Sequence, residues 1–138
     1  MAGYGYRDHV SDVRVRAWGS SLGETFAQAC LGMWAMVAEP CSVPPKRKWT
    51  ICAAGQDLEE LLVNLMNEQI LEFDTKGLVA GGVETVSVAE QGGAFAATAV
   101  LWGCVSAELS KPPRRHLKAA TFHDLLVSPN LVEVTLDV

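Results

Sequence analysis

The stretch DLEELLVNLMNEQILEFDTKG, residues 57–77, carries the clearest secondary-structure signal in the chain. Asp57 followed by Glu60 is a capping signature, in which side-chain oxygens accept hydrogen bonds from free backbone N–H groups at the start of a helix. Apolar side chains then recur at helical spacing, at Leu58, Leu61, Leu62, Leu65, Met66 and Phe73. Gly77 suits the left-handed conformation that ends many helices. These residues predict an amphipathic helix that packs against a sheet.

The segments before this helix predict a strand, a second helix and a second strand. Residues 11–18 alternate between apolar and polar side chains, as a half-buried strand does. Ser21 and Glu24 form a capping box before a run of apolar residues at helical spacing, which predicts a helix of about four turns. The three prolines between residues 40 and 45 predict an exposed loop, and residues 49–54 predict a short strand.

The segments after the helix predict four further strands. Residues 83–89 and 94–102 flank Gly92 and Gly93, whose freedom to adopt a positive φ suits a hairpin turn. Because both runs are apolar on both faces, we expect this hairpin to be buried. Residues 117–126 and 131–138 predict two more strands, joined by a turn that contains a proline.

The predicted element order is β-α-β-α-β-β-β-β, which indicates an α+β fold with helices packed on a mainly antiparallel sheet. One strand-helix-strand-strand module, residues 48–106, is inserted into another that the last two strands complete. The fold is therefore expected to be a nested pair of strand-helix-strand-strand modules. A length of 138 residues with 49% hydrophobic side chains fits one domain, residues 1–138, with a sizeable core.

The composition narrows the class of protein. A net charge of −5 opposes nonspecific binding to a phosphate backbone, so any contact with RNA is expected to be indirect. The longest charge-free stretch, residues 91–107, is shorter than the about 20 apolar residues of a membrane span. The first residues lack the pattern of a secretory signal, which favours a cytoplasmic protein. Cys30, Cys52 and Cys104 lie among apolar residues and are expected to be reduced and buried.

Two carboxylates suggest a site for a hard cation. Alternation puts Asp12 on the polar face of the first predicted strand and Asp137 on the polar face of the last. If these strands meet, the two side chains could bind calcium or magnesium, helped by a carbonyl or the α-carboxylate of Val138. The alternative is an ion pair between Asp12 and Arg14, with Asp137 solvated.

Other patterns argue against common catalytic motifs. The histidines are too scattered for a zinc motif, and the chain has neither a G-x-S-x-G elbow nor a phosphate-binding glycine loop. Lys118, His123 and Asp124 form a further polar cluster, in which alternation places Lys118 with Asp124 and opposite His123. Basic runs at residues 46–48 and 114–118 could hold an acidic partner or be solvated loop charge.

Four segments in this order resemble the archease family, accessory proteins of the GTP-dependent RNA-splicing ligase of the RtcB type: YRDHVSDVRVRAWG, DLEELLVNLMNEQILEFDTKGL, KAATFHDL and VTLDV. The resemblance covers nearly the whole chain. It implies the nested fold and no catalysis by the protein itself. It also implies a role in helping the ligase to guanylylate its own active-site histidine and to turn over repeatedly in tRNA splicing and RNA repair.

The resemblance also implies functional residues. The family's D-H-T-A-D box falls on residues 8–12, which gives Asp12 a metal-ligand role and makes Asp8 and His9 candidate partner-binding residues. The family's closing acidic-aliphatic pair falls on Asp137 and Val138. The implied metal site is thus Asp12, Asp137 and Val138, with calcium or another divalent cation as cofactor.

The family's K-A-x-T-Y-H stretch falls on residues 118–123 and makes Lys118 a candidate partner contact. The chain departs from the family at Val10 and Ser11, and at Arg14, where the family has a small glycine. If Arg14 occupied the site, metal affinity would be weakened.

Three functional hypotheses remain at this point. The first is a noncatalytic activator of an RtcB-type RNA ligase, which contacts RNA only through the ligase and has no membrane partner. The second is a small metal-assisted hydrolase in which Asp12 and Asp137 hold the ion that activates water and His9 is the adjacent base. The third is a structural or binding module.

Overall fold

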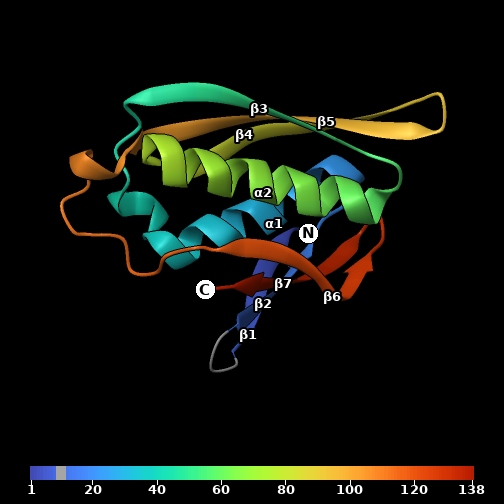
Figure 1. Ribbon diagram of the computed structural model, residues 1–138, viewed down its shortest axis with the longest axis horizontal. Coiled ribbons are helices and arrows are strands. Elements are labelled where there is room, and N and C mark those ends of the chain that lie inside the picture. Colours follow the sequence, from blue (N-terminus) through green and yellow to red (C-terminus); the bar gives the residue numbers. More distant parts are fainter. Residues whose placement is uncertain (9–11) are drawn as a thin grey trace.

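The computed structural model describes residues 1–8 and 12–138, and these form two antiparallel sheets with two helices between them (Figure 1). The helices are α1 (Leu22–Val37) and α2 (Leu58–Lys76), and short 3-10 turns follow at Pro40–Ser42 and Ser106–Glu108. The strands are β1 (Gly3–Asp8), β2 (Asp12–Trp18), β3 (Arg47–Gly55), β4 (Leu78–Gln91), β5 (Ala94–Val105), β6 (Ala119–Val127) and β7 (Leu131–Asp137).

The strand order explains the nesting. One sheet has the order β1-β2-β7-β6 and joins the two ends of the chain, whereas the other, β3-β5-β4, comes from its middle. The predicted α+β fold with its nested order is therefore confirmed. The division into a single domain with an inserted module at residues 48–106 stays a prediction.

The predicted order lacked one strand, β1. It pairs with β2 along its whole length, as an edge strand of the first sheet. Gly3 and Gly5 interrupt the apolar alternation that would have marked it. Gly3 is needed there, because a Cβ on it would lie 2.6 Å from the Trp18 ring.

Both helices begin at the caps that the sequence predicts, and α2 also ends at its predicted C-terminal glycine. Ser21 Oγ accepts a hydrogen bond from the backbone N–H of Glu24 at 3.1 Å, and Asp57 Oδ1 accepts one from that of Glu60 at 2.8 Å. Gly77 ends α2 with a φ of 70°, in the left-handed region. These caps are local and fix the start of both helices and the end of α2.

The predicted burial of the β4–β5 hairpin was wrong for one of its faces. Ala97, Ala99 and Leu101 are buried, whereas Ala96 and Thr98 of the same strand are exposed. Only the inner face of this sheet is covered by helices (Figure 1), and Ala96 and Thr98 are small side chains whose exposure costs little free energy.

The same register corrects the prediction for Cys52. Its strand pairing sets it opposite Thr98 on the outer face, where it is exposed. Cys30 and Cys104 are buried as expected, and all four cysteines are free. Within the described ranges no helix has the length and apolar character to cross a membrane.

A buried polar contact joins the helices between the two sheets. Trp34 Nε1 donates to Gln69 Oε1 at 2.7 Å, and Gln69 Nε2 donates to Leu65 O at 3.1 Å. Gln69 is 1% exposed, so both halves of its amide are satisfied inside the core. Cys30 Sγ also accepts from Gln69 Nε2, and burial raises the pKa of this thiol to about 11.

We predict that Gln69→Leu lowers the free energy of unfolding by about 1–3 kcal/mol, because it leaves the buried indole N–H of Trp34 without an acceptor. Glu68→Leu, at an exposed position of the same helix, is the matched control and should have a much smaller effect. Denaturant unfolding measures both. Equal stability of Gln69→Leu and the unmodified chain would contradict this account of the helix contact.

Candidate metal and partner site

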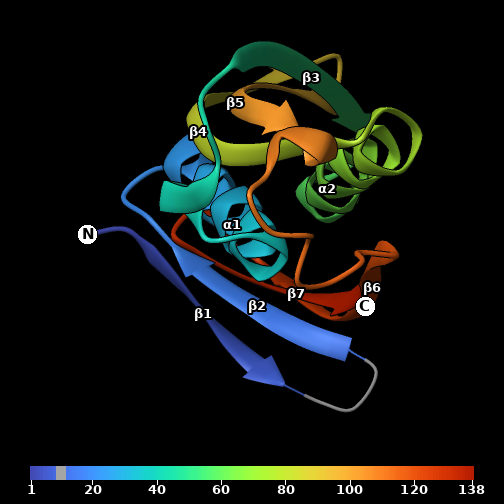
Figure 2. The same cartoon turned by 90° about the vertical axis from the view of Figure 1, so that its left-hand side faces the viewer.

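The pairing of β2 with β7 brings two acidic residues from opposite ends of the chain together. β2 and β7 lie side by side (Figure 2), and in their antiparallel register Asp12 lies directly opposite Asp137. Residues opposite each other in a sheet point to the same face. Core-facing neighbours confirm the face, since Val13 and Leu136 are buried at 1% and 0% exposure. Both carboxylates therefore lie on the polar face, as the alternation predicted.

The environment of Asp12 is unusual. The residue is half-buried, and its Oδ1 is the single buried side-chain oxygen or nitrogen without a hydrogen-bond partner among the side chains of residues 1–7 and 12–138. A buried carboxylate oxygen without a partner costs about 1–3 kcal/mol or more. A cation beside it would remove this cost. Asp137 is exposed and can supply a second carboxylate to the same cation.

Arg14 does not occupy this site. Its Nε donates to Glu133 Oε1 at 2.7 Å, its Nη1 to Thr135 Oγ1 at 3.3 Å, and its Nη2 to the carbonyl oxygen of Asp124. The ion pair between Arg14 and Asp12, which was the alternative to a metal site, is not found in the described part of the chain. Register is the reason, because Arg14 lies opposite Thr135 and beside Glu133.

The carbonyl oxygen of Asp124 that accepts from Arg14 lies in an irregular segment of β6. The pairing of β6 with β7 shifts between Thr121 and Leu126, so that residues 122–125 bulge out against a single residue of β7. Asp124 has a φ of 50°, and its carboxylate lies 3.3 Å from the ring of His123. This bulge breaks the alternation from which a common face of Lys118 and Asp124 was expected.

The backbone of Lys118 lies next to that of Asp137. Its backbone N–H donates to the carbonyl oxygen of Asp137 at 3.0 Å, and Ala119 pairs with Asp137 in the β6–β7 register. The residue is exposed, and its ammonium has no ion pair with any described residue. Two carboxylates from the neighbouring strands β2 and β7 and an unpaired cation from the residue that precedes β6 therefore lie at this end of the sheet.

The remaining predicted site residues are Asp8, His9 and Val138. Asp8 ends β1 and pairs with Val13, next to Asp12 in the sheet. His9 lies outside the described residues. Val138 is partly buried against the core, and its main-chain oxygens follow Asp137 directly.

The donor set fits part of a calcium site. Calcium takes about six to eight oxygen ligands, and Asp12 and Asp137 with main-chain oxygens of Val138 would supply some of them. Among the described residues no group of three or more His, Cys, Asp or Glu side chains is placed to hold a metal. The fit therefore rests on the carboxylate pair and on the unpartnered oxygen of Asp12.

Sequence reasoning missed the Arg14–Glu133 pair. Both residues stand on polar faces that alternation identifies, but their contact depends on the register of two strands that are more than 100 positions apart. A hint was present, since a cation and an anion stand on the polar faces of the first and last predicted strands. Alternation alone gives no register.

The chain was compared with known proteins. Residues 4–138 match the model of the archease protein family. Protein archease of Aeropyrum pernix is 30% identical over 123 residues, which cover 89% of this chain and 85% of the relative. Protein archease of Thermococcus kodakarensis is 29% identical over 127 residues, which cover 92% and 89%.

The fold agrees with a solved structure. The solution structure of Methanobacterium thermoautotrophicum protein 1598 superposes with a TM-score of 0.81 and 23% identity, covering 99% of both chains. With a family match over nearly its whole length, this chain belongs to the archease family.

The Arg14 contact predicts a pH dependence. The hydrogen bond from Arg14 holds the pKa of Glu133 below its ordinary value, so the ionised carboxylate stabilises the folded state above the unfolded pKa and this contribution is lost as the pH falls through the folded pKa. Glu133→Gln should therefore be less stable than the unmodified chain at pH 7, and the difference should narrow below about pH 4.

Thermal unfolding between pH 3 and 7 measures this difference. Glu84→Gln is the control, because Glu84 pairs with Lys48 on the surface, where both side chains are at least half exposed. A constant gap between Glu133→Gln and the unmodified chain at every pH would contradict the role assigned to Arg14.

Proposed function

We propose that this protein is a noncatalytic activator of an RtcB-type, GTP-dependent RNA ligase. In this proposal it promotes guanylylation of the ligase's active-site histidine and repeated turnover in tRNA splicing or RNA repair, and it contacts RNA only through the ligase. Membership of the archease family carries the proposal. The juxtaposition of Asp12, Asp137 and Lys118 supports it, because these are the positions onto which the family's metal and partner roles fall.

The carboxylate pair supports the proposal of a divalent cation as cofactor. Asp12 and Asp137, with main-chain oxygens of Val138, would hold calcium or another divalent cation. Such an ion supplies charge neutralisation at the junction of β2 and β7. Asp12 offers its unpartnered Oδ1 as a ligand, and the register keeps Asp137 opposite it.

Lys118 is the proposed contact with the ligase. Its exposed ammonium can pair with a carboxylate of the partner, and its backbone is fixed to Asp137. Metal binding and partner binding would then be coupled through one segment, because the strand that presents Asp137 also anchors Lys118.

A metal-assisted hydrolase is the alternative function, and the described residues favour it less. Such an enzyme needs a base near the metal-bound water. His116 faces Asp74 and His123 faces Asp124, so each is engaged with a carboxylate that is not part of the Asp12–Asp137 pair. His9, the base named from the sequence, lies outside the described residues.

The first prediction from this function concerns the ligase. Incubation of a purified RtcB-type ligase with GTP and its metal ion should give more ligase–GMP adduct and more ligated RNA per ligase molecule when this protein is added. The protein alone should ligate no RNA and hydrolyse no GTP. Equal adduct formation and turnover with and without this protein would contradict the proposal.

The second prediction concerns Lys118. Lys118→Ala should leave the melting temperature nearly unchanged, since an exposed lysine contributes little to stability, and should reduce ligase activation several-fold. Lys76→Ala, which removes another exposed lysine, is the control and should activate normally. A collapse of stability, or full activation by Lys118→Ala, would rule out Lys118 as a contact.

The third prediction concerns the cation. In calorimetric titration with calcium, Asp12→Asn and Asp137→Asn should each bind at least tenfold more weakly than the unmodified chain, because each loses a charged ligand. Glu68→Gln, which removes an exposed carboxylate of α2, is the matched control. The same affinity in all four proteins would mean that the two aspartates are solvated surface groups.

A further inference from the structure

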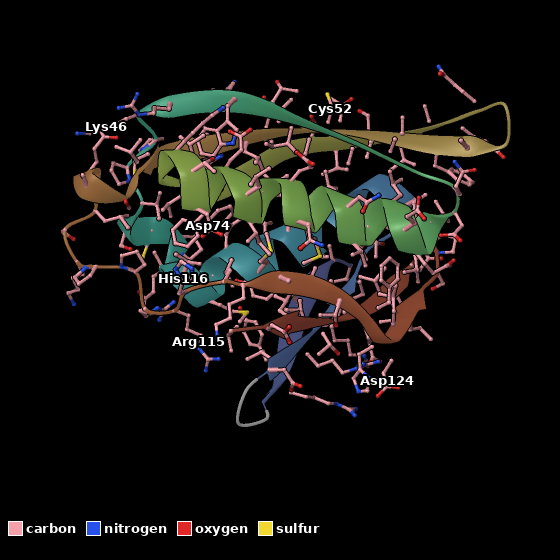
Figure 3. The ribbon with its side chains drawn as sticks, in the orientation of Figure 1. Lys46, Cys52, Asp74, Arg115, His116 and Asp124 are labelled. Atoms are coloured by element: carbon pink, nitrogen blue, oxygen red, sulfur yellow. The ribbon has the colours of Figure 1, made fainter. Side chains whose placement is uncertain are left out.

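Basic side chains gather in two loop regions of this acidic protein. Residues 39–48 and 106–118 contain seven of the eleven lysines and arginines but two of the sixteen acidic residues. We call these two segments the basic end. Figure 3 shows Lys46, Arg115 and His116 on the same end of the molecule. The rest of the chain is correspondingly acidic, so the charge is strongly separated along the molecule.

Contacts between the two segments hold the basic end together. Lys46 and Arg47 lie 3.6 and 3.3 Å from the carboxylate of Glu108. The backbone N–H of Val105 also donates to Glu108 at 2.9 Å, and this bond is the main reason that the pKa of Glu108 is lowered. Glu108 therefore stays ionised and is already engaged by cations of its own end.

Arg114 binds the C-terminal end of α1. Its backbone N–H donates to the carbonyl oxygen of Val37 at 2.7 Å, and its guanidinium donates to that of Ala35. These carbonyls belong to the last turn of α1, which has no basic residue of its own. Arg114 thus supplies the cation that suits a helix C-terminus. It also lies 3.9 Å from Glu39.

The cations that remain are free to meet a partner. Lys111 and Arg115 are exposed and have no ion pair with the side chains of residues 1–7 or 12–138. They stand on either side of Arg114, on the segment that Arg114 ties to α1. Their positions are therefore fixed by the fold, while their charges are unpaired.

A cavity of about 370 Å³ lies between this segment, residues 37–42 and the end of α1. Leu109 and Pro112 give it apolar surface, and Lys111 and Arg114 bring positive charge to it. Its volume lies in the range of small-ligand sites and is suited to one or two side chains.

The lining favours a protein segment over RNA. The apolar lining side chains cannot pair with a phosphodiester. None of the described lining residues is aromatic, so the cavity offers no surface on which a base would stack. An apolar side chain flanked by carboxylates matches both the apolar lining and the unpaired cations.

We propose that the basic end docks an acidic segment of a partner protein, which inserts an apolar side chain into this cavity and places carboxylates against Lys111 and Arg115. The inference holds for any partner that carries such a segment and does not depend on the proposed ligase function. The cavity itself is not lined by Asp12, Lys118 or Asp137.

The test uses two fluorescein-labelled heptapeptides, EDELEDE and EDESEDE, and a labelled single-stranded RNA heptamer. Fluorescence anisotropy should show that the full-length protein binds EDELEDE at least fivefold more tightly than EDESEDE, because only the leucine can fill the cavity. Lys111→Glu/Arg115→Glu should weaken EDELEDE binding at least tenfold. Arg7→Glu, a single charge reversal at an exposed position of β1, should leave it unchanged.

A second measurement on the unmodified protein keeps the test valid if the double variant fails to fold. Amide NMR shifts on adding EDELEDE should concentrate at residues 37–42 and 109–115. Equal binding of both peptides, shifts centred elsewhere, or no peptide binding would each overturn the proposal. Tighter binding of the RNA, lost in Lys111→Glu/Arg115→Glu, would make this end a nucleic-acid surface and would also overturn it.

Discussion

The pairing of β2 with β7 is the constraint on which the candidate site depends. It joins residues 12–18 to residues 131–137, and so connects the two ends of the chain in the centre of one sheet. Because side chains alternate along a strand, a slip of one residue would turn Val13 and Val15 toward solvent and drive a charged neighbour into the core. The buried apolar face therefore fixes the register, and the register in turn sets Asp12 opposite Asp137.

The helices could be predicted because their signals are local. Caps at Ser21 and Asp57 and the left-handed Gly77 need no information from distant parts of the chain. β1 and the exposure of Cys52 could not be predicted, since both depend on which strand lies alongside and which face the helices cover. An apolar run of small residues does not reveal whether one or both of its faces are buried.

The candidate site, too, could be predicted from the sequence only in part. Alternation put Asp12 and Asp137 on polar faces, and the resemblance to a family gave them a role, but only the three-dimensional pairing shows that they meet. The contacts of Arg14 could not be predicted from the sequence for a further reason. One of its acceptors, the carbonyl oxygen of Asp124, is brought into reach by a bulge in β6. Because Arg14 binds Glu133, it does not pair with the buried oxygen of Asp12, which has no hydrogen-bond partner.

The central claim is that the carboxylate pair at the β2–β7 junction holds a divalent cation. The most direct measurement is an anomalous difference map from crystals grown with calcium. The account predicts a peak at about 2.3–2.6 Å from a carboxylate oxygen of Asp12 and from one of Asp137. A map with no peak at these two residues, and with Asp12 Oδ1 hydrogen-bonded to a protein donor, would contradict it.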